Sequence, residues 1–129
     1  MRTIIAGSRG ITDYAVVVDA IRASGLTITK VISGMARGVD MLGLEYARAN
    51  SIDWAEYRAK WNARRTVIGP DGRELSQLYF DKQANYKRNR LMAENADALI
   101  AIWDGVSKGT SHMINIANEK GLHVYVHKV

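Results

Sequence analysis

Short apolar runs rich in β-branched residues alternate along this chain with stripes of apolar residues at helical spacing, and this alternation most constrains the fold. Each run is short enough to be a buried strand, and three of them are followed directly by turn residues. The runs that we expect to be strands are Thr3–Ala6, Thr29–Ser33, Ile52–Tyr57, Ala98–Trp103 and Leu122–Val126. Buried strands that alternate with helices indicate a parallel sheet. We therefore predict a three-layer, Rossmann-like α/β fold with strand order 3-2-1-4-5 and right-handed crossovers.

Four helical stripes separate these strands. The first contains Tyr14, Val17, Val18 and Ile21, with Thr12 placed to cap its start and Gly25 its end. The second runs from about residue 39 and stops near Asn50, and the last ends at Gly121. The third is expected from about Asp81 to Asn95. One side of that helix should carry Ala84, Arg88, Leu91, Met92 and Asn95.

Residues 58–80 do not fit this alternation. Two short β-prone runs surround Gly69, Pro70, Asp71 and Gly72, which are typical turn residues. We predict a protruding hairpin at about residues 62–80, inserted into a single domain that otherwise occupies residues 1–129.

Composition narrows the functional classes. The chain has no cysteine, which excludes disulfides and thiolate metal sites. No apolar run reaches the roughly 18 residues needed to span a bilayer, and the N-terminal apolar run is too short for a signal peptide. We expect a cytoplasmic protein with no membrane contact and no metal. The histidines His123 and His127 alternate without a partner pattern, which gives no reason to expect a metal ligand set.

Positive charge is concentrated in residues 58–90. The basic residues there are Arg58, Lys60, Arg64, Arg65, Arg73, Lys82, Lys87, Arg88 and Arg90, against the acids Asp71, Glu74 and Asp81. Such a segment either meets an anionic partner or forms a solvated basic surface. The aromatic residues among and beside them are Trp54, Tyr57, Trp61, Tyr79, Phe80 and Tyr86. They can stack nucleic-acid bases or close the core.

Three of the predicted strands end in glycine-containing turns that directly precede helices. The turns are Gly7-Ser8-Arg9-Gly10, Ser33 to Gly38, and Asp104 to Thr110. Helix N-termini present free N–H groups and attract anions, and glycine lets the backbone approach a phosphate closely. All three turns fall at one edge of the predicted sheet, near the point where strand order reverses, where ligands bind in such folds. We predict a phosphate-binding site there, although each turn alone is more often only a tight connection.

Four segments in the chain resemble the SLOG superfamily of Rossmann-like domains. They are Gly7-Ser8-Arg9, Ser33 through Asp40, Arg88 through Met92, and Asp104-Gly105 with Gly109-Thr110. The resemblance is to the YspA/cpYpsA-related branch, a group of largely unknown function that is frequent in phages and mobile elements. It covers almost the whole chain except about residues 62–80. It implies a bound nucleotide or nucleotide-derived molecule, and a role in signal sensing or sequestration if the source is a phage.

One related family, the cytokinin-activating phosphoribohydrolases, cleaves the base from nucleoside monophosphates. Its R-K-x-x-M element resembles Arg88 through Met92, and its P-G-G-x-G-T-x-x-E element resembles the segment that ends Gly109-Thr110-Ser111-His112-Met113. Met113 stands where the resemblance places the catalytic glutamate, and methionine cannot assist water or stabilise an oxocarbenium-like state. An N-glycosidase therefore ranks below a binding protein. If the chain is an enzyme, Arg88, Asp40 and Asp104 are the catalytic candidates.

A second related family, DNA-processing protein A, handles single-stranded DNA. Its S-G-x-A-x-G-x-D motif resembles Ser33 through Asp40, and this resemblance implies an alternative in which residues 58–90 bind single-stranded nucleic acid. Relatives of this kind are often dimers or larger, so a homo-oligomer is expected.

The predicted ligand site takes residues from all three turns and from the third helix. Asp40 can cap N–H groups or contact a ribose. Arg88 can meet a phosphate or pair with Asp104, and the resemblance favours the ligand role. Asn89 can fix that arginine or read a base. Trp103 can stack on a base or cover the core, and His112 is expected at the surface. No cofactor is expected. The site residues are Gly7, Ser8, Arg9, Ser33, Gly34, Ala36, Gly38, Asp40, Arg88, Asn89, Trp103, Asp104, Gly105, Ser107, Gly109 and Thr110.

Overall fold

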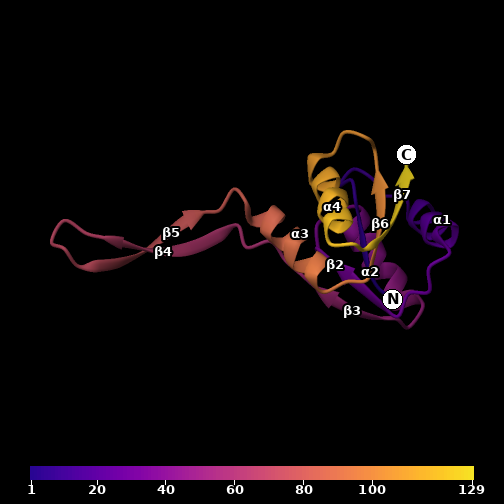
Figure 1. The fold of residues 1–129 in the computed structure, drawn as a ribbon, viewed down its shortest axis with the longest axis horizontal. Coiled ribbons are helices and arrows are strands. Elements are labelled where there is room, and N and C mark those ends of the chain that lie inside the picture. Colours follow the sequence, from indigo (N-terminus) through magenta and orange to yellow (C-terminus); the bar gives the residue numbers. More distant parts are fainter.

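The computed structural model describes residues 1–129 and contains seven strands and four helices (Figure 1). In chain order they are β1 (Arg2–Gly7), α1 (Tyr14–Ser24), β2 (Lys30–Ser33), α2 (Val39–Ala49), β3 (Asp53–Glu56), β4 (Asn62–Ile68), β5 (Glu74–Phe80), α3 (Ala84–Glu94), β6 (Ala98–Trp103), α4 (Lys108–Glu119) and β7 (His123–Lys128). None of these helices is both long and apolar enough to cross a membrane.

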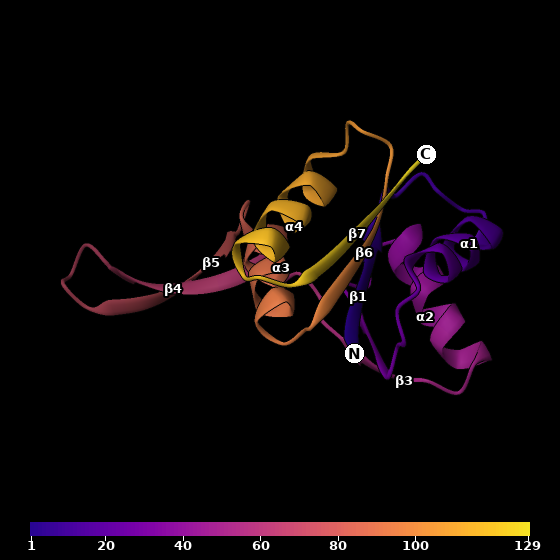
Figure 2. The ribbon, with the colours of Figure 1, turned by 45° about the vertical axis from the view of Figure 1, so that its right-hand side comes forward.

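Five strands form one parallel sheet in the order β3-β2-β1-β6-β7. Helices α1 and α2 cover one face of the sheet, and α3 and α4 cover the other (Figure 2). The predicted three-layer fold and its strand order are confirmed. Because the order reverses between β1 and β6, their carboxyl ends flank the crevice in which folds of this kind bind ligands.

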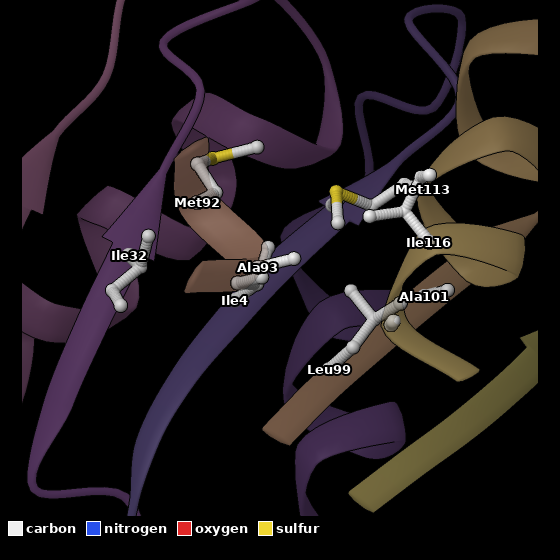
Figure 3. Close-up of a cluster of buried hydrophobic side chains, with 10 residues drawn as sticks. Ile4, Ile32, Met92, Ala93, Leu99, Ala101, Met113 and Ile116 are labelled. Atoms are coloured by element: carbon white, nitrogen blue, oxygen red, sulfur yellow. The ribbon is translucent and has the colours of Figure 1, made fainter. Parts of the chain in front are cut away.

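The core has two halves because successive residues of a strand point to opposite faces of the sheet. On the α3–α4 side, Ile4, Ile32 and Leu99 pack with Met92 and Met113 (Figure 3). On the α1–α2 side, the alternate strand residues are Ile5, Val31, Ile100 and Ile102, and they pack on residues such as Val17 and Val39. The central strands are thus buried on both sides, as their uninterrupted apolar runs predicted.

The expected start of α1 is wrong by one residue. Asp13, not Thr12, caps this helix, and its carboxylate accepts a hydrogen bond of 3.0 Å from the Ala15 N–H. Gly25 ends the helix in the left-handed conformation (φ 68°), as predicted.

The third helix begins three residues later than predicted, and the predicted side is buried only in part: Ala84 and Met92 are buried and Arg88 is half-buried. Asp81 forms a turn in front of α3 instead of its first residue, and its carboxylate accepts from the Gln83 N–H at 2.9 Å. Leu91 is 48% exposed, whereas Asn89 and Ala93 are buried. The prediction is thus wrong at Leu91, because apolarity gives no reason to expect that α3 buries the amide of Asn89.

The inserted hairpin is confirmed. Strands β4 and β5 pair only with each other, in antiparallel register, and extend well away from the main sheet (Figure 1). The Gly69 N–H donates to the Arg73 carbonyl at 2.8 Å, which closes the ribbon, and Gly72 takes a φ of 78° in the turn. The hairpin leads directly into the turn before α3.

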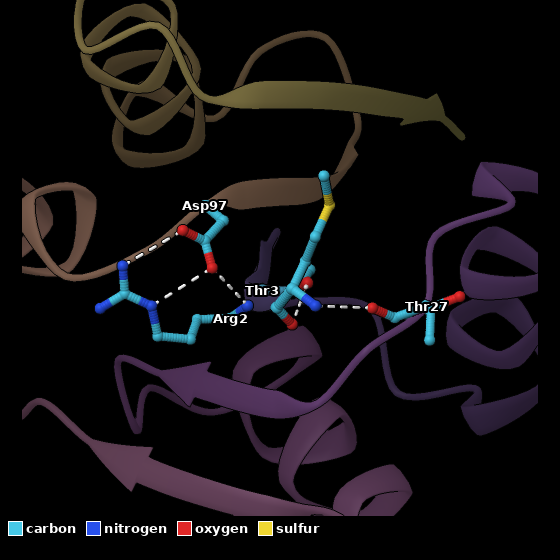
Figure 4. A network of polar contacts seen from close by, with 5 residues as sticks. Arg2, Thr3, Thr27 and Asp97 are labelled. Carbon is cyan, nitrogen blue, oxygen red and sulfur yellow. Dashed lines mark hydrogen bonds and ion pairs between the residues drawn. The ribbon is translucent and has the colours of Figure 1, made fainter.

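Polar contacts fix the amino ends of the two central strands (Figure 4). Asp97 accepts hydrogen bonds from the Arg2 backbone N–H (2.8 Å) and from Nε (3.2 Å) and Nη2 (3.1 Å) of its guanidinium. The Arg2 guanidinium holds the pKa of Asp97 below its ordinary value. These contacts join the two strands at the ends opposite to the ligand crevice, next to the first paired residues Thr3 and Ala98.

Candidate functional site

A cleft of about 400 Å³ opens at the carboxyl ends of β1, β2 and β6. Its walls come from the three predicted turns, from α3 and from the base of the hairpin. The lining residues are Ala6, Gly7, Ser8, Arg9, Gly10, Ala36, Asp40, Trp61, Asn85, Arg88, Asn89, Met92, Asp104, Ser107, Gly109, Thr110 and Met113.

The turn after β1 is joined to the turn after β6 by backbone and hydroxyl contacts. The Ser8 N–H donates to the Ile102 carbonyl at 3.1 Å, and the Ser8 hydroxyl oxygen accepts from the Asp104 N–H at 3.3 Å. Ser8 is buried. These bonds hold the two turns side by side at the switch point of the sheet.

The turn after β2 is held tightly against the first turn. The Ser33 hydroxyl donates to the Asp40 carbonyl at 3.1 Å and accepts from the Met35 N–H at 3.2 Å. Gly38 precedes α2 with a φ of 80°, and a Cβ there would lie 2.5 Å from the Arg9 carbonyl oxygen. Only glycine fits both the conformation and the close approach.

Asp40, Arg88 and Gly34 meet at one point of the site. An Arg88 Nη1–H donates to the Gly34 carbonyl at 2.5 Å, and the Asp40 carboxylate accepts from the Ala36 N–H at 3.2 Å. A Cβ on Gly34 would lie 2.7 Å from Arg88 Nη1 and 2.8 Å from Asp40 Oδ2. A glycine at position 34 therefore makes room for both charged side chains. Arg88 forms no ion pair within 4.0 Å with either Asp40 or Asp104.

Burial dominates the electrostatics of this pair. Asp40 is only 5% exposed, and burial raises its pKa from 3.8 to about 6, against the opposing attraction of Arg88 and the Ala36 N–H. Burial also lowers the pKa of Arg88, although nearby Asp40 opposes this change. A buried carboxyl that titrates near neutral pH beside a cleft is typical of a functional site.

Asn89 links Arg88 to the first turns of α4. Its Oδ1 accepts from Arg88 Nε at 3.1 Å, and its Nδ2 lies 3.4 Å from the Gly109 carbonyl and 3.1 Å from His112 Nδ1. Contrary to expectation, His112 is half-buried and lies against the Tyr86 ring at a centroid distance of 4.3 Å. Burial lowers the pKa of His112, and Arg90 adds to this effect. His112 therefore helps to hold the Asn89 amide in place beside the cleft.

The Asp104 carboxylate stabilises the turn after β6. Its Oδ1 accepts from the N–H groups of Val106 (2.9 Å) and Ser107 (2.8 Å), which hold its pKa below the ordinary value. The Trp103 indole N–H donates to the Ser107 carbonyl at 3.1 Å. Asp104 and Trp103 thus both stabilise the loop that precedes α4.

Most of the predicted site residues gather in the cleft, but five do not line it. Gly34 lines an adjoining pocket of about 370 Å³ that shares Arg9, Ala36, Trp61 and Arg88 with the cleft. The others that lie outside it are Ser33, Gly38, Trp103 and Gly105. Ser33 and Gly38 shape the second turn, and Gly105, with a φ of 86°, shapes the third.

The lining includes six residues that the list of predicted site residues lacks: Ala6, Gly10, Trp61, Asn85, Met92 and Met113. Trp61 stands at the base of the hairpin, where its ring stacks on Phe80 at 5.7 Å with an interplanar angle of 10°. Its position among basic and aromatic residues indicates a possible base-stacking role, but no motif near Trp61 in the sequence links it to the glycine-containing turns. Asn85 lies one turn before Asn89 on α3, so helical spacing could have found it.

The arrangement favours binding of an anion beside an apolar patch. Two guanidinium groups, Arg9 and Arg88, and the N-termini of α2 and α4 supply positive potential. Met92 and Met113, each 1% exposed, form the floor. No group of three or more histidine, aspartate or glutamate side chains is placed to hold a metal ion.

Comparisons with known proteins support the fold and the predicted resemblance. The model of the YspA, cpYpsA-related SLOG family matches residues 1–63, and no curated protein matches the chain. The solved structure of DNA processing protein A from Streptococcus pneumoniae matches with a TM-score of 0.68 at 20% identity. That match covers 97% of this chain and 49% of the other, so this chain spans about half the length of that protein. The structure of Sa239, at 13% identity over 97% of this chain and 53% of its own, has a TM-score of 0.40, too low to indicate a shared fold.

Proposed function

For a chain whose residues 1–63 match the YspA, cpYpsA-related SLOG family, we propose that the cleft binds a nucleotide or nucleotide-derived small molecule. The observation that supports this most is the convergence of three glycine-containing turns, two helix N-termini and two arginines on one cleft of about 400 Å³. This volume is in the range of small-molecule sites. Signal sensing or sequestration, a phage or mobile-element context and a cytoplasmic location stay predictions.

Phosphate recognition would use Arg88 and the N-terminus of α4. Contacts with Gly34, Tyr57 and Asn89 occupy Nη1 and Nε of Arg88, which leaves Nη2 without a protein partner. A guanidinium held in this way loses little conformational entropy when a phosphate binds. Gly109 lies in the first turn of α4, and a Cβ there would come within 4.0 Å only of Asn85 Nδ2. The backbone of Gly109 is thus accessible to a phosphate.

The base or sugar of the ligand would lie against the apolar and amide side of the cleft. Trp61 provides an aromatic wall, Met92 and Met113 provide an apolar floor, and Asn85 and Asn89 provide amide groups. This combination of stacking surface and a few polar groups is typical of nucleotide sites.

Thermal-shift and calorimetric titrations test this proposal. The panel contains nucleoside mono-, di- and triphosphates, cyclic dinucleotides and adenosine-diphosphate-ribose derivatives. A ligand at about 100 times its dissociation constant should stabilise the fold by about 2.7 kcal/mol. Arg88→Gln should weaken binding of the hit by tenfold or more, because a charged hydrogen bond contributes about 1.5–3 kcal/mol.

Two variants control this experiment. Arg73→Gln removes the same charge at the exposed end of the hairpin and should leave binding unchanged. Gly109→Ala has room in the fold but narrows the cleft, so it should weaken binding with little change in stability. If no member of the panel shifts the melting temperature, or if Arg88→Gln and Arg73→Gln act alike, the proposal is wrong.

An N-glycosidase is a second candidate because Asp40 is a cleft carboxyl with a pKa of about 6. The Asp104 carboxylate is already occupied by two N–H groups of its own loop, and Met113 offers no acid–base chemistry. Asp40 is therefore the residue that would assist cleavage. Chromatography of each incubated nucleotide would reveal a released base, and Asp40→Asn should abolish that release while binding persists.

Single-stranded nucleic acid is a third candidate, supported by the exposed basic residues of segment 58–90. All of them except Arg88 are exposed, and the Arg65 guanidinium lies 5.0 Å from the centroid of the Tyr79 ring. Affinity for a short single-stranded oligonucleotide should then fall steeply with salt and weaken in Arg64→Gln/Arg65→Gln. Gly109→Ala should leave that affinity unchanged.

A further inference from the structure

The pocket of about 370 Å³ that adjoins the main cleft is the more positively charged of the two. Four of its nine lining residues are arginines and none is acidic, so we call it the arginine pocket. These arginines are Arg9, Arg37, Arg58 and Arg88. In the main cleft, the charges of Arg9 and Arg88 are partly offset by two acids, Asp40 and Asp104. The excess of positive charge therefore lies in the arginine pocket.

Four separate segments of the chain bring these arginines together. They come from the turn after β1 (Arg9), the turn before α2 (Arg37), the segment after β3 (Arg58) and α3 (Arg88). Of the four, only Arg58 has a carboxylate within 4.0 Å, and its contact with Glu56 at 3.5 Å joins two exposed side chains. Such a surface ion pair is weak. Like charges held close together repel one another, so an anion that binds among them is stabilised.

The arginine pocket is continuous with the main cleft. The two share Arg9, Ala36, Trp61 and Arg88. A ligand whose first phosphate lies at Arg88 and the N-terminus of α4 can therefore extend past the shared residues toward Arg37 and Arg58. Trp61 stands at this boundary, where its ring can stack on a base or sugar that connects two anionic groups.

From this excess of positive charge we propose that the arginine pocket binds a second anionic group of the same ligand, which is a nucleotide with at least two phosphate groups. This inference rests on the proposed function of the main cleft. Arg88 lines both spaces and lies between the two phosphates, whereas Arg37 and Arg58 contact only the second one. The planar guanidinium group matches the geometry of phosphate oxygens. A nucleoside monophosphate occupies the main cleft and leaves Arg37 and Arg58 unused.

Isothermal titration calorimetry of the full chain can compare ligands that differ in their number of phosphates. The one-phosphate probes are nucleoside monophosphates with each of the common bases. The two-phosphate probes are the corresponding diphosphates, whose phosphates are adjacent, and cyclic dinucleotides, whose phosphates are separate. At least one two-phosphate probe should bind about tenfold or more tightly than the monophosphate of the same base, because the second phosphate adds charged hydrogen bonds.

Arg37→Gln and Arg58→Gln are the decisive variants. Each should remove most of that gain, while the affinity for the monophosphate stays unchanged, because neither residue lines the main cleft. Both side chains are exposed, so thermal unfolding should show a folded domain in each variant. The matched control Arg22→Gln removes the same charge at the exposed end of α1 and should bind every probe as the wild type does.

Two results would overturn this inference and leave the proposed function standing. The first is a monophosphate that binds as tightly as every two-phosphate probe of its base. The second is a gain in affinity that Arg37→Gln and Arg58→Gln leave intact, or a loss that is equal for probes with one and two phosphates. If no nucleotide of either kind binds, even where a single-stranded oligonucleotide does, the inference and the proposed function fail together.

Discussion

Replacing Asp40 with asparagine should stabilise the fold at pH 7, although it removes a charge close to Arg88. Asparagine has nearly the same shape, and its carbonyl can accept the hydrogen bond from the Ala36 N–H that Asp40 accepts at 3.2 Å. The substitution therefore removes the cost of an ionised buried carboxyl and little else. This cost exists because burial raises the pKa of Asp40 more than Arg88 and the surrounding N–H groups lower it.

The size of the expected stabilisation follows from the pKa of Asp40. A change from 3.8 to about 6 corresponds to about 3 kcal/mol, at about 1.4 kcal/mol for each tenfold change in ionisation. Asp40 is 5% exposed, so solvent screening reduces this figure little. Between pH 3.8 and 6 the folded state binds more protons than the unfolded state, so Asp40 makes the fold less stable as pH rises through this window. Asp40→Asn should thus be about 3 kcal/mol more stable at pH 7 and nearly equal to wild type below pH 4.

Urea unfolding of both proteins at a series of pH values from 3.5 to 8 measures this difference directly. The subtraction cancels the contributions of other groups, including His112, whose lowered pKa makes the fold less stable as pH falls. Asp19→Asn, the same change on an exposed carboxyl of α1, should follow the wild-type curve. Parallel curves for wild type and Asp40→Asn would refute the reasoning, as would a variant that is less stable at pH 7.

Other expectations can be checked with the same unfolding assay. Gly34→Ala should destabilise the fold by about 1–3 kcal/mol and weaken binding of any cleft ligand, because the new Cβ would displace Arg88 or Asp40. Leu99→Ala, in the fully buried centre of β6, should cost about 2–5 kcal/mol with an unchanged m-value. Asp97→Asn should destabilise the fold at neutral pH, and the difference should disappear as pH falls through the lowered pKa of Asp97, because the protonated carboxyl no longer attracts the arginine.

Sequence patterns predicted the sheet well because its signals are local. A strand such as Ala98–Trp103 is apolar at every position, and its bounds were predicted to the residue. The first helix start was missed because Thr12 and Asp13 are both good caps, and only the geometry of the chain chooses between them. Asn89 was placed in the site, yet its burial was not expected, because a buried amide is stable only when long-range partners such as Gly109 and His112 satisfy it.

The candidate site was less predictable where residues distant in sequence meet. The glycine turns are visible in the sequence because each follows a strand. The hydrogen bond from Arg88 to Gly34, which brings Arg88 near Asp40, depends on how α3 crosses the sheet, which no periodicity encodes. Trp61 was missed from the site for the same reason, since it reaches the cleft from the inserted hairpin.

The position of β1 at the centre of the sheet has a consequence for synthesis on the ribosome. One edge of β1 pairs with β2, which is made soon afterwards, whereas the other edge pairs with β6, at Ala98–Trp103. Until those residues emerge, the nascent chain carries β1 with a row of unpaired backbone groups, a template for pairing with other chains. The cleft also needs the turn after β6 and the start of α4, so a nascent chain pairs the open edge of β1 just before it can complete its ligand site.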